Sequence, residues 1–295
     1  MPEPDTAQQP IYHYTDAAGL RGILQTGRIW ATHTDFLNDA AELTFACNEL
    51  KVALREQIEV VKLLDESADQ GGSREVAKSF LGDFVEDLNG TTGGNVYVSS
   101  FSLDGDSLAQ WRAYAPAGYA IEFEEADFFE LTPEEEAAAL KSSPGGHSQG
   151  RWKKVAYGQH ASAFAKTLAA EARDYYLHNL PAGNSGVHVQ KSMVDFFADA
   201  LPLMKHDSFA VEREQRLVVL PGARPLLFRD SGLVMGPIPY VEIPFHRDSI
   251  KGVRVGPGPN RELRARSASM LLTSIFGDEK SARKRVEVST SPARS

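Results

Sequence analysis

Two long helical patterns in the first third of the chain, set among short strand patterns, constrain the fold more than any other feature. Across residues 40–64 apolar side chains recur three and four positions apart, as on one face of an α-helix, and residues 75–88 repeat this spacing. The flanking segments are short and rich in β-branched and aromatic residues, which favour strands. We therefore expect an α+β fold with a mixed β-sheet core, in which strands from both ends of the chain share one sheet and helices are inserted between them.

The remaining segments fit this scheme. A strand at residues 11–15 precedes a helix that Asp16 begins as an N-cap and Gly27 ends. Further strands are expected at residues 29–31, 95–102, 119–123, 152–155, 157, 216–220, 240–244 and 250–255, and further helices at residues 160–178 and 187–203. We expect a single domain over residues 11–276 with helical inserts near 40–90 and 160–203, a disordered lead-in at 1–10 and a basic C-terminal tail at 277–295.

Composition excludes several classes of protein. The 295 residues contain no apolar run of the roughly 18 residues that a membrane helix needs, and the start has neither the basic nor the apolar part of a signal peptide. The single cysteine, Cys47, excludes an intrachain disulfide and a cysteine-based zinc cage. We expect a soluble, cytoplasmic protein.

The charge balance argues against tight non-specific binding of nucleic acid, because the net charge is −9. The balance reverses after residue 260, where eight basic residues face four acidic ones. This basic end could contact nucleic acid, but a solvated tail is the simpler interpretation.

The common catalytic motifs do not occur. The sequence contains no dinucleotide-binding G-x-G-x-x-G, P-loop, H-E-x-x-H or G-x-S-x-G motif. Three short segments nevertheless carry residues suited to a site. Tyr12-His13-Tyr14-Thr15 places a histidine on a strand, where it could also be an ordinary core residue. Residues 99–102, Ser-Ser-Phe-Ser, are followed by Gln110, Trp111 and Tyr114 and could line a pocket or form a sheet edge. Asn38, Asp39 and Glu42 have the spacing of a helix cap.

A fourth segment, Glu212-Arg213-Glu214-Gln215-Arg216, places two carboxylates two positions apart, on the same side of an extended backbone. Such clustering tends to raise the pKa of one carboxyl and is typical of functional sites. Arg213 and Arg216 could instead neutralise the carboxylates in a solvated ladder. Both interpretations stay open at this point.

Taken in order, these motifs resemble the DUF2971 family of bacterial proteins of uncharacterised function. The resemblance runs from about residue 11 to residue 259, with insertions near 65–95 and 130–150. It rests on Tyr-His-Tyr-Thr, Gly-x-Ile-Trp, Leu-Asn-Asp-x-x-Glu, Ser-Phe-Ser, Gln-Trp-x-x-Tyr-x-x-x-Gly-Tyr-x-Ile-x-Phe and Glu-x-Glu-x-Arg-Leu-Val, closed by Ile-Lys-Gly-Val-Arg-Val-Gly-Pro at 250–257.

That family is in turn similar to the ADP-ribosyltransferase fold, whose split β-sheet core binds NAD between two small sheets. The resemblance implies that the cleft holds NAD as a substrate and no metal. It implies three catalytic residues, Glu214, Glu212 and His13. It further implies that NAD contacts His13, Tyr14, Thr15, Asn38, Ser100, Ser102, Trp111 and Tyr114.

The implied chemistry accounts for these residue types. Cleavage of the nicotinamide–ribose bond passes through an oxocarbenium-like transition state, as glycoside cleavage does. Glu214 would stabilise that cation, Glu212 would orient or deprotonate the acceptor, and His13 would hold ribose. Tyr14 or Trp111 would stack on nicotinamide. The implied protein is an NAD-dependent ADP-ribosyltransferase-like enzyme, a toxin or phage-defence effector whose macromolecular acceptor is a protein or a nucleic acid.

Two other functions compete with this one. The same cleft could hold a nucleotide without turnover, as a binding or sensor module does. Alternatively, His33, Asp35, Asp39 and Asp104 could serve a metal-dependent hydrolase or nuclease, with magnesium favoured by the carboxylates. Helix caps and turns explain those four residues more simply.

Overall fold

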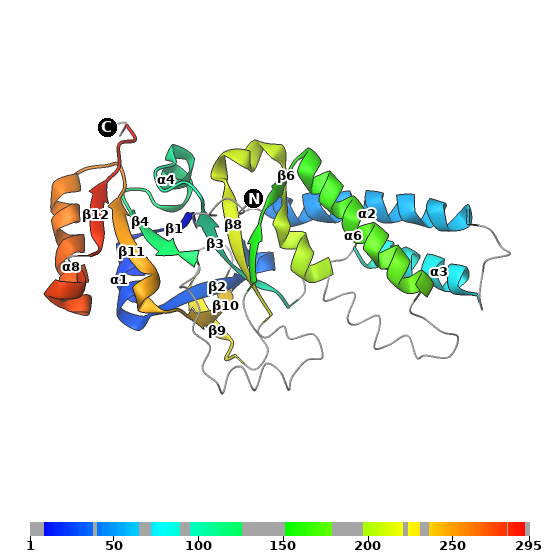
Figure 1. The fold of residues 1–295 in the computed structure, drawn as a ribbon, viewed down its shortest axis with the longest axis horizontal. Helices are drawn as coiled ribbons and strands as arrows, with labels where there is room; N and C mark the ends of the chain where they lie inside the picture. Colours follow the sequence, from blue (N-terminus) through cyan, green and yellow to red (C-terminus); the bar gives the residue numbers. More distant parts are fainter. Residues whose placement is uncertain are drawn as a thin grey trace, which may run out of the picture.

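The structure is a computed structural model that describes residues 9–37, 40–64, 72–88, 95–125, 151–178, 197–220, 224–230, 236–281 and 283–292. Within these residues a ten-stranded, largely antiparallel mixed sheet forms the centre of the molecule. A lobe of three helices extends from one end of the sheet and a single long helix lies at the other end (Figure 1). The expected α+β fold with a mixed sheet is confirmed.

Strands from the beginning, the middle and the end of the chain lie side by side in this sheet. Along its main path the order is β12 (Arg285–Val288), β11 (Ile250–Val255), β4 (Tyr119–Glu124), β1 (Pro10–Thr15), β3 (Tyr97–Ser102), β2 (Arg28–His33), β10 (Pro237–Pro244) and β9 (Leu227–Asp230). Off this path, β8 (Glu214–Val219) pairs with β3, and β5 (Arg151–Lys154) pairs with β8. Of the pairs in this sheet, β11–β12 is parallel and the others are antiparallel.

The sheet has a slot between β1 and β2, next to the middle of β3. One edge of β3 pairs with β8 along its whole length. Its other edge pairs with β1 at Ser102 and with β2 at Tyr97 and Val98. On this edge, residues 99–101 of the described β3 therefore face the gap between β1 and β2 and pair with neither strand.

Local signals set the helix that follows β1. The Asp16 carboxylate accepts a hydrogen bond from the Gly19 amide at 2.7 Å and caps α1 (Ala17–Thr26), and Gly27 ends that helix with φ +66°. Leu20 and Leu24 bury one face of α1 against the sheet, in the same core as Leu272 of α8 (Arg261–Ser281).

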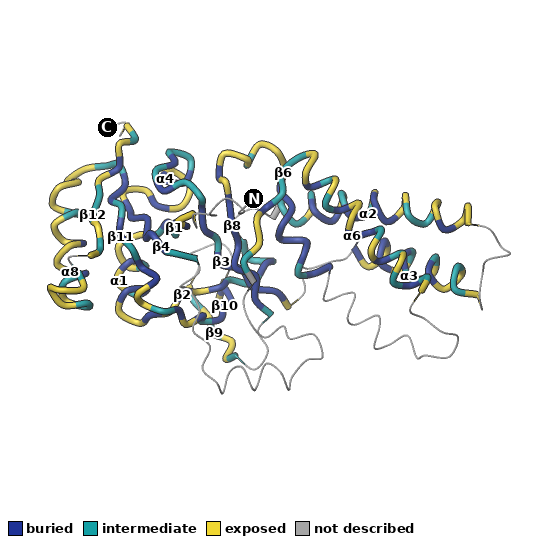
Figure 2. The backbone as a smooth tube through the Cα atoms, viewed as in Figure 1, coloured by how far each residue is buried: buried dark blue, intermediate teal, exposed yellow. Residues whose placement is uncertain are grey.

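The three-helix lobe has a core of its own. Helices α2 (Ala40–Lys62), α3 (Ser73–Asp87) and α6 (Gln159–His178) turn their apolar faces toward one another. Figure 2 shows the buried positions on the facing sides of these helices and the exposed ones outside. The lobe is joined to the sheet through η4 (Leu201–Leu203), β7 (Met204–Lys205), which pairs with β6 (Ala156–Tyr157), and η5 (Asp207–Glu212).

The chain from residue 277 differs from the predicted solvated tail. Helix α8 extends to Ser281, and β12 then joins the sheet beside β11. Arg285 lies 2.6 Å from the Glu122 carboxylate, Lys284 donates to the backbone oxygen of Ile250, and Glu287 of β12 lies 2.6 Å from Arg254. The prediction of a tail was therefore wrong for residues 277–281 and 283–292.

Several predictions fall wholly or partly outside the described residues. These are most of the lead-in, the loop at 144–150 and residues 187–196 of the predicted helix at 187–203. Residues 197–203 are helical as predicted. No described helix is long and apolar enough to span a membrane.

The packing around Gly118 predicts a clear difference between two glycine substitutions. A Cβ at Gly118 would lie 2.3 Å from the backbone oxygen of Thr15, whereas a Cβ at Gly82 in α3 would meet nothing within 4 Å. We expect Gly118→Ala to lower the free energy of unfolding by about 1–3 kcal/mol. We expect Gly82→Ala to raise it by about 0.5–1 kcal/mol, because alanine favours a helix. Denaturant titration of both variants measures this, and equal effects would contradict the packing described.

Candidate functional site

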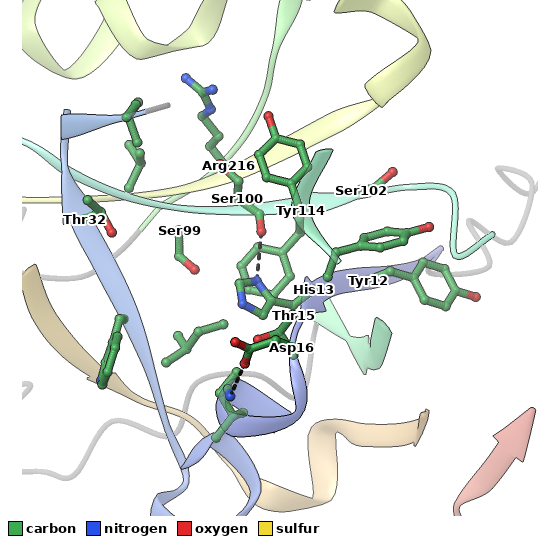
Figure 3. A pocket seen from close by; sticks show the side chains of 18 of the residues that line it. Tyr12, His13, Thr15, Asp16, Thr32, Ser99, Ser100, Ser102, Tyr114 and Arg216 are labelled. Carbon is green, nitrogen blue, oxygen red and sulfur yellow. Dashed lines mark hydrogen bonds between the residues drawn. The ribbon is translucent and has the colours of Figure 1, made fainter. Parts of the chain in front are cut away.

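A cavity of about 590 Å³ follows the slot in the sheet. Ser100 and Ser102 line it from one face of β3, while Ser99 and Phe101 line it from the other. It therefore reaches through the slot (Figure 3). Eight of the ten predicted site residues line this cavity, namely His13, Tyr14, Thr15, Ser100, Ser102, Tyr114, Glu212 and Glu214. Asn38 lies outside the described residues.

His13 bridges the slot. Its Nδ1–H donates to the backbone oxygen of Ser100 at 3.0 Å, across the gap where β3 lacks a neighbouring strand (Figure 3). Burial lowers the pKa of His13, so the ring is neutral near pH 7. With Nδ1 as donor, Nε2 is left as an acceptor. His13 therefore combines the structural role weighed from the sequence with a nitrogen that can accept a hydrogen bond at the cavity.

The serines of β3 differ in their hydrogen bonds. The Ser102 hydroxyl donates to the backbone oxygen of Glu212 at 2.7 Å and accepts from the Asp104 amide, so it holds the segment that carries the carboxylates. Ser99 is buried, and its hydroxyl has no hydrogen-bond partner among the described residues. Sequence reasoning singled out Ser100 and Ser102 but assigned no role to Ser99.

A buried ion-pair cluster lies at one end of the cavity. The Nζ of Lys205 contacts Glu42, Glu212 and Glu214 at 2.7, 2.6 and 2.7 Å. Arg216 contacts Glu214 at 2.7 Å and Glu42 at 2.8 Å. These five side chains come from α2, β7, η5 and β8, so the cluster joins the helical lobe to the sheet.

The cluster holds three carboxylates against two cations and so carries one excess negative charge. Burial alone would raise the pKa of Glu214, but Arg216 and Lys205 hold it at about 2. Burial alone would lower the pKa of Lys205, but Glu214 and Glu42 raise it. Glu214 and Lys205 therefore stay charged at neutral pH. The sequence predicted that the clustering of carboxylates would raise the pKa of one of them. For Glu214 this is contradicted, because Arg216 and Lys205 contact the carboxylate directly and lower its pKa.

The two carboxylates of the Glu-x-Glu motif differ in their surroundings. Both oxygens of Glu214 accept from cations, Oε1 from Arg216 and Oε2 from Lys205 and Arg216. Glu212 accepts from Lys205 through Oε2, while its Oε1 lies 3.3 Å from the Tyr114 hydroxyl. Glu212 therefore accepts fewer hydrogen bonds from cations than Glu214 does. Arg213, with φ +46°, is exposed and lies outside the cluster.

The structure places two predicted residues differently from their expected role. Trp111 is 1% exposed, its ring meets Tyr14 edge-on at 4.6 Å, and it does not line the cavity. The Tyr14 hydroxyl donates to the Asp104 backbone and accepts from the Ser107 amide. Trp111 is thus a buried support and cannot stack on a ligand, so that prediction was wrong. Among the described aromatic rings that line the cavity, the most exposed are Trp30, at 45%, and Tyr114, at 38%; Trp30 was not predicted as a site residue.

Sequence reasoning also missed Lys205 and the second role of Glu42. Lys205 lies on a two-residue strand and has no motif around it. Glu42 has the spacing of a cap residue, which concealed its contact with Lys205.

Among the described residues of the alternative metal site, His33 and Asp35 lie close together, with Nδ1 and Oδ2 3.8 Å apart. The His33 imidazole accepts from the Asp35 amide and caps η1 (Thr34–Phe36), and Asp104 accepts from the Asp106 amide in a turn. Asp39 lies outside the described residues. Among the residues described, no three His, Cys, Asp or Glu side chains are placed to hold a metal ion.

Asp106 holds α4 (Leu108–Tyr114), the helix that carries Tyr114 to Glu212. Its Oδ1 accepts from the Trp111 indole at 2.8 Å and from the Ser289 hydroxyl. Its Oδ2 accepts from the Thr290 amide and hydroxyl, each at 2.8 Å. Burial would raise the pKa of Asp106, but these hydrogen bonds lower it. The segment after β12 therefore anchors α4 beside the cavity.

We expect Asp106→Ala to lower the free energy of unfolding by about 2–3 kcal/mol, because it leaves the buried Trp111 indole and Ser289 hydroxyl without this acceptor. Asp248→Ala is the matched control, since Asp248 forms an exposed pair with Lys280 at 3.8 Å and its loss should change stability by less than about 0.5 kcal/mol. Denaturant titration compares the two variants. Equal losses would show that Asp106 does not anchor α4.

The low pKa of Glu214 predicts acid sensitivity. With a folded-state pKa of about 2 against an ordinary value of 4.5, its contribution is complete above pH 4.5 and is lost as the pH falls toward 2. The size of this contribution is about 3 kcal/mol. We expect Glu214→Gln to flatten the fall of unfolding free energy across this window. Glu59→Gln, which removes an exposed partner of Lys62, should keep the wild-type slope. An unchanged slope in Glu214→Gln would contradict the prediction.

With this geometry in place, comparison with known proteins adds one finding. Residues 110–217 match the family described as "Protein of unknown function (DUF2971)". The matched region runs from α4 to β8 and includes Tyr114, Lys205, Glu212 and Glu214. No curated protein and no solved structure matches the chain. The family resemblance predicted from the order of the motifs is thus supported over residues 110–217, the region that carries Lys205, Glu212, Glu214 and Arg216 of the ion-pair cluster.

Proposed function

We propose that this protein is an NAD-dependent ADP-ribosyltransferase-like enzyme that cleaves the nicotinamide–ribose bond in the cavity and transfers ADP-ribose to a macromolecule. The observation that carries the proposal is the convergence of three distant segments. His13, the serines of β3 and the Glu212–Glu214 pair are the elements that the resemblance singles out, and all of them line one cavity.

The form of the sheet supports the proposal. ADP-ribosyltransferases bind NAD between the two halves of a split sheet, and here β1 and β2 diverge from β3 at the cavity. On the edge of the described β3 that faces away from β8, residues 99–101 pair with no strand, so a ligand can approach this edge closely.

The charge of the cluster also supports it. An oxocarbenium-like transition state develops positive charge at the ribose. The cluster supplies one excess negative charge in a buried setting, where fixed charges act more strongly than in water.

The contacts favour different roles for Glu212 and Glu214 from those expected from the sequence. Glu212, whose Oε1 faces only the Tyr114 hydroxyl among the described groups, stabilises the ribose cation. Glu214 holds Lys205 and Arg216, and Lys205 in turn fixes Glu212. His13 Nε2 accepts a hydrogen bond from a ribose hydroxyl.

In this reaction the bond between ribose C1′ and the nicotinamide nitrogen breaks, and its electron pair leaves with nicotinamide. A nucleophilic atom of the acceptor then bonds to C1′ and releases its proton. The acceptor, a protein or a nucleic acid, is identified by incubation with labelled NAD in cell lysate and treatment with protease or nuclease.

We expect Glu212→Gln to lower the rate of nicotinamide release from NAD by about 100- to 1,000-fold, because it removes a charge that acts in the transition state. The shape of the side chain is kept, and nicotinamide is measured in a coupled assay with lysate as acceptor. Glu75→Gln, on the exposed surface of α3, is the control and should match the wild type. Unchanged release in Glu212→Gln would refute the catalytic role.

A second candidate is a nucleotide-binding module without turnover, and the full pairing of Glu214 with cations favours it. A rise in melting temperature with NAD, without release of nicotinamide, would identify this function. For the enzyme we propose in addition a role as a bacterial toxin or phage-defence effector. Growth of cells expressing the wild type or Glu212→Gln tests this role.

A further inference from the structure

One face of the sheet continues from the ion-pair cluster to its far edge. Residues opposite each other on neighbouring strands point to the same face. The strand register from β8 through β3, β2 and β10 to β9 therefore places on one face Arg216, Ser100, Val98, Thr32, Tyr240, Trp30, Glu242, Ile238 and Arg229. Seven of these line the same cavity as Glu212 and Glu214, among them Thr32, Trp30, Glu242 and Arg229 at the far end.

Trp30 is fixed at this far end but not covered. Its indole Nε1 donates to Glu242 at 3.3 Å, and the Tyr240 ring lies 4.4 Å away. With 45% of its surface exposed at the cavity, the ring offers a held aromatic surface to a ligand. A stacked heteroaromatic ring is the partner that such a surface favours.

Arg229 supplies an uncommitted cation beside that ring. Its Nη2 donates to the Thr32 hydroxyl at 3.2 Å, and its Cζ lies 5.9 Å from the centre of the Trp30 ring. Its buried Nε–H has no acceptor among the described residues, and none of their carboxylates forms an ion pair with it. A guanidinium in this state is suited to a phosphate.

The cavity is therefore polarised. One end, at β8, carries the excess negative charge. The other, at β2, β10 and β9, carries Arg229, the Trp30 ring and the Arg28–Glu242 pair, and so has one excess positive charge. The path from β8 to β9 crosses four strand spacings, or about 19 Å. A ligand that fits has a positive ring at one end, phosphates along its length and a planar base at the other end.

We propose that Trp30 and Arg229 form a subsite for the adenosine-phosphate half of a dinucleotide, with the base stacked on Trp30 and phosphate bound by Arg229. This inference rests on the proposed function and deepens it, because the polarity of the cavity admits NAD in one orientation, with the nicotinamide ribose beside Glu212.

The test is calorimetric titration of the full chain with AMP, adenosine and nicotinamide riboside. We expect Trp30→Ala to weaken the binding of AMP and adenosine by about ten-fold or more, since base stacking contributes at this level. Arg229→Gln should weaken AMP by a similar factor and leave adenosine unchanged. Both variants should bind nicotinamide riboside as the wild type does.

The matched control is Phe228→Ala. Phe228 lies next to Arg229 on β9, is 59% exposed and points to the opposite face of the strand, so AMP binding should not change. Trp30 and Arg229 are not core residues, and thermal unfolding of each variant checks that the fold is kept.

The outcomes separate the two proposals. AMP binding that depends on Trp30 and Arg229, without nicotinamide release from NAD, supports the subsite while the proposed enzyme fails. Release of nicotinamide that depends on Glu212, with AMP binding equal in wild type and Trp30→Ala, overturns the subsite while the enzyme stands. Absence of AMP binding to the wild type overturns the subsite as well.

Discussion

The ammonium of Lys205, held by three carboxylates, is the contact on which the rest of the site depends. A buried cation without partners costs far more than a paired one, so Glu42, Glu212 and Glu214 must lie where they do for the chain to fold. Because Glu42 belongs to the helical lobe and Glu214 to the sheet, the same contact fixes the lobe against the sheet. The side chains that stabilise the contact between the lobe and the sheet are thus the same ones that form the candidate site.

The slot beside β3 is the second constraint. A sheet normally pairs the backbone of a central strand on both edges, yet residues 99–101 of β3 meet diverging strands. The His13 imidazole compensates in part by donating to the Ser100 carbonyl. The fold therefore exposes main-chain groups to a cavity without leaving all of them unpaired. The exposed groups can form hydrogen bonds to a ligand.

Local signals predicted much of this, and long-range contacts account for what they missed. Asp16 and Gly27 mark a helix whose ends follow from adjacent residues, and the Glu212–Glu214 spacing was recognisable in the sequence. Lys205 gave no signal, because it lies on a two-residue strand with no motif around it and its contact with Glu42 joins distant parts of the chain. Trp111 was misplaced because its indole is occupied by Asp106, a contact that spacing does not reveal. The strand after α8 was missed because its basic residues find carboxylates elsewhere in the fold.

The anchoring of α4 by residues 289–291 has a consequence for the order of folding. Asp106 and its partners are separated by more than 180 positions, so this contact closes one of the longest loops in the chain. During synthesis the sheet strands that precede β11 emerge first, and α4, which ends at Tyr114, gains its anchor only when residues 289–291 have been added. The cavity wall formed by Tyr114 is consequently completed late, so the nascent chain carries an unfinished site until its last strand docks.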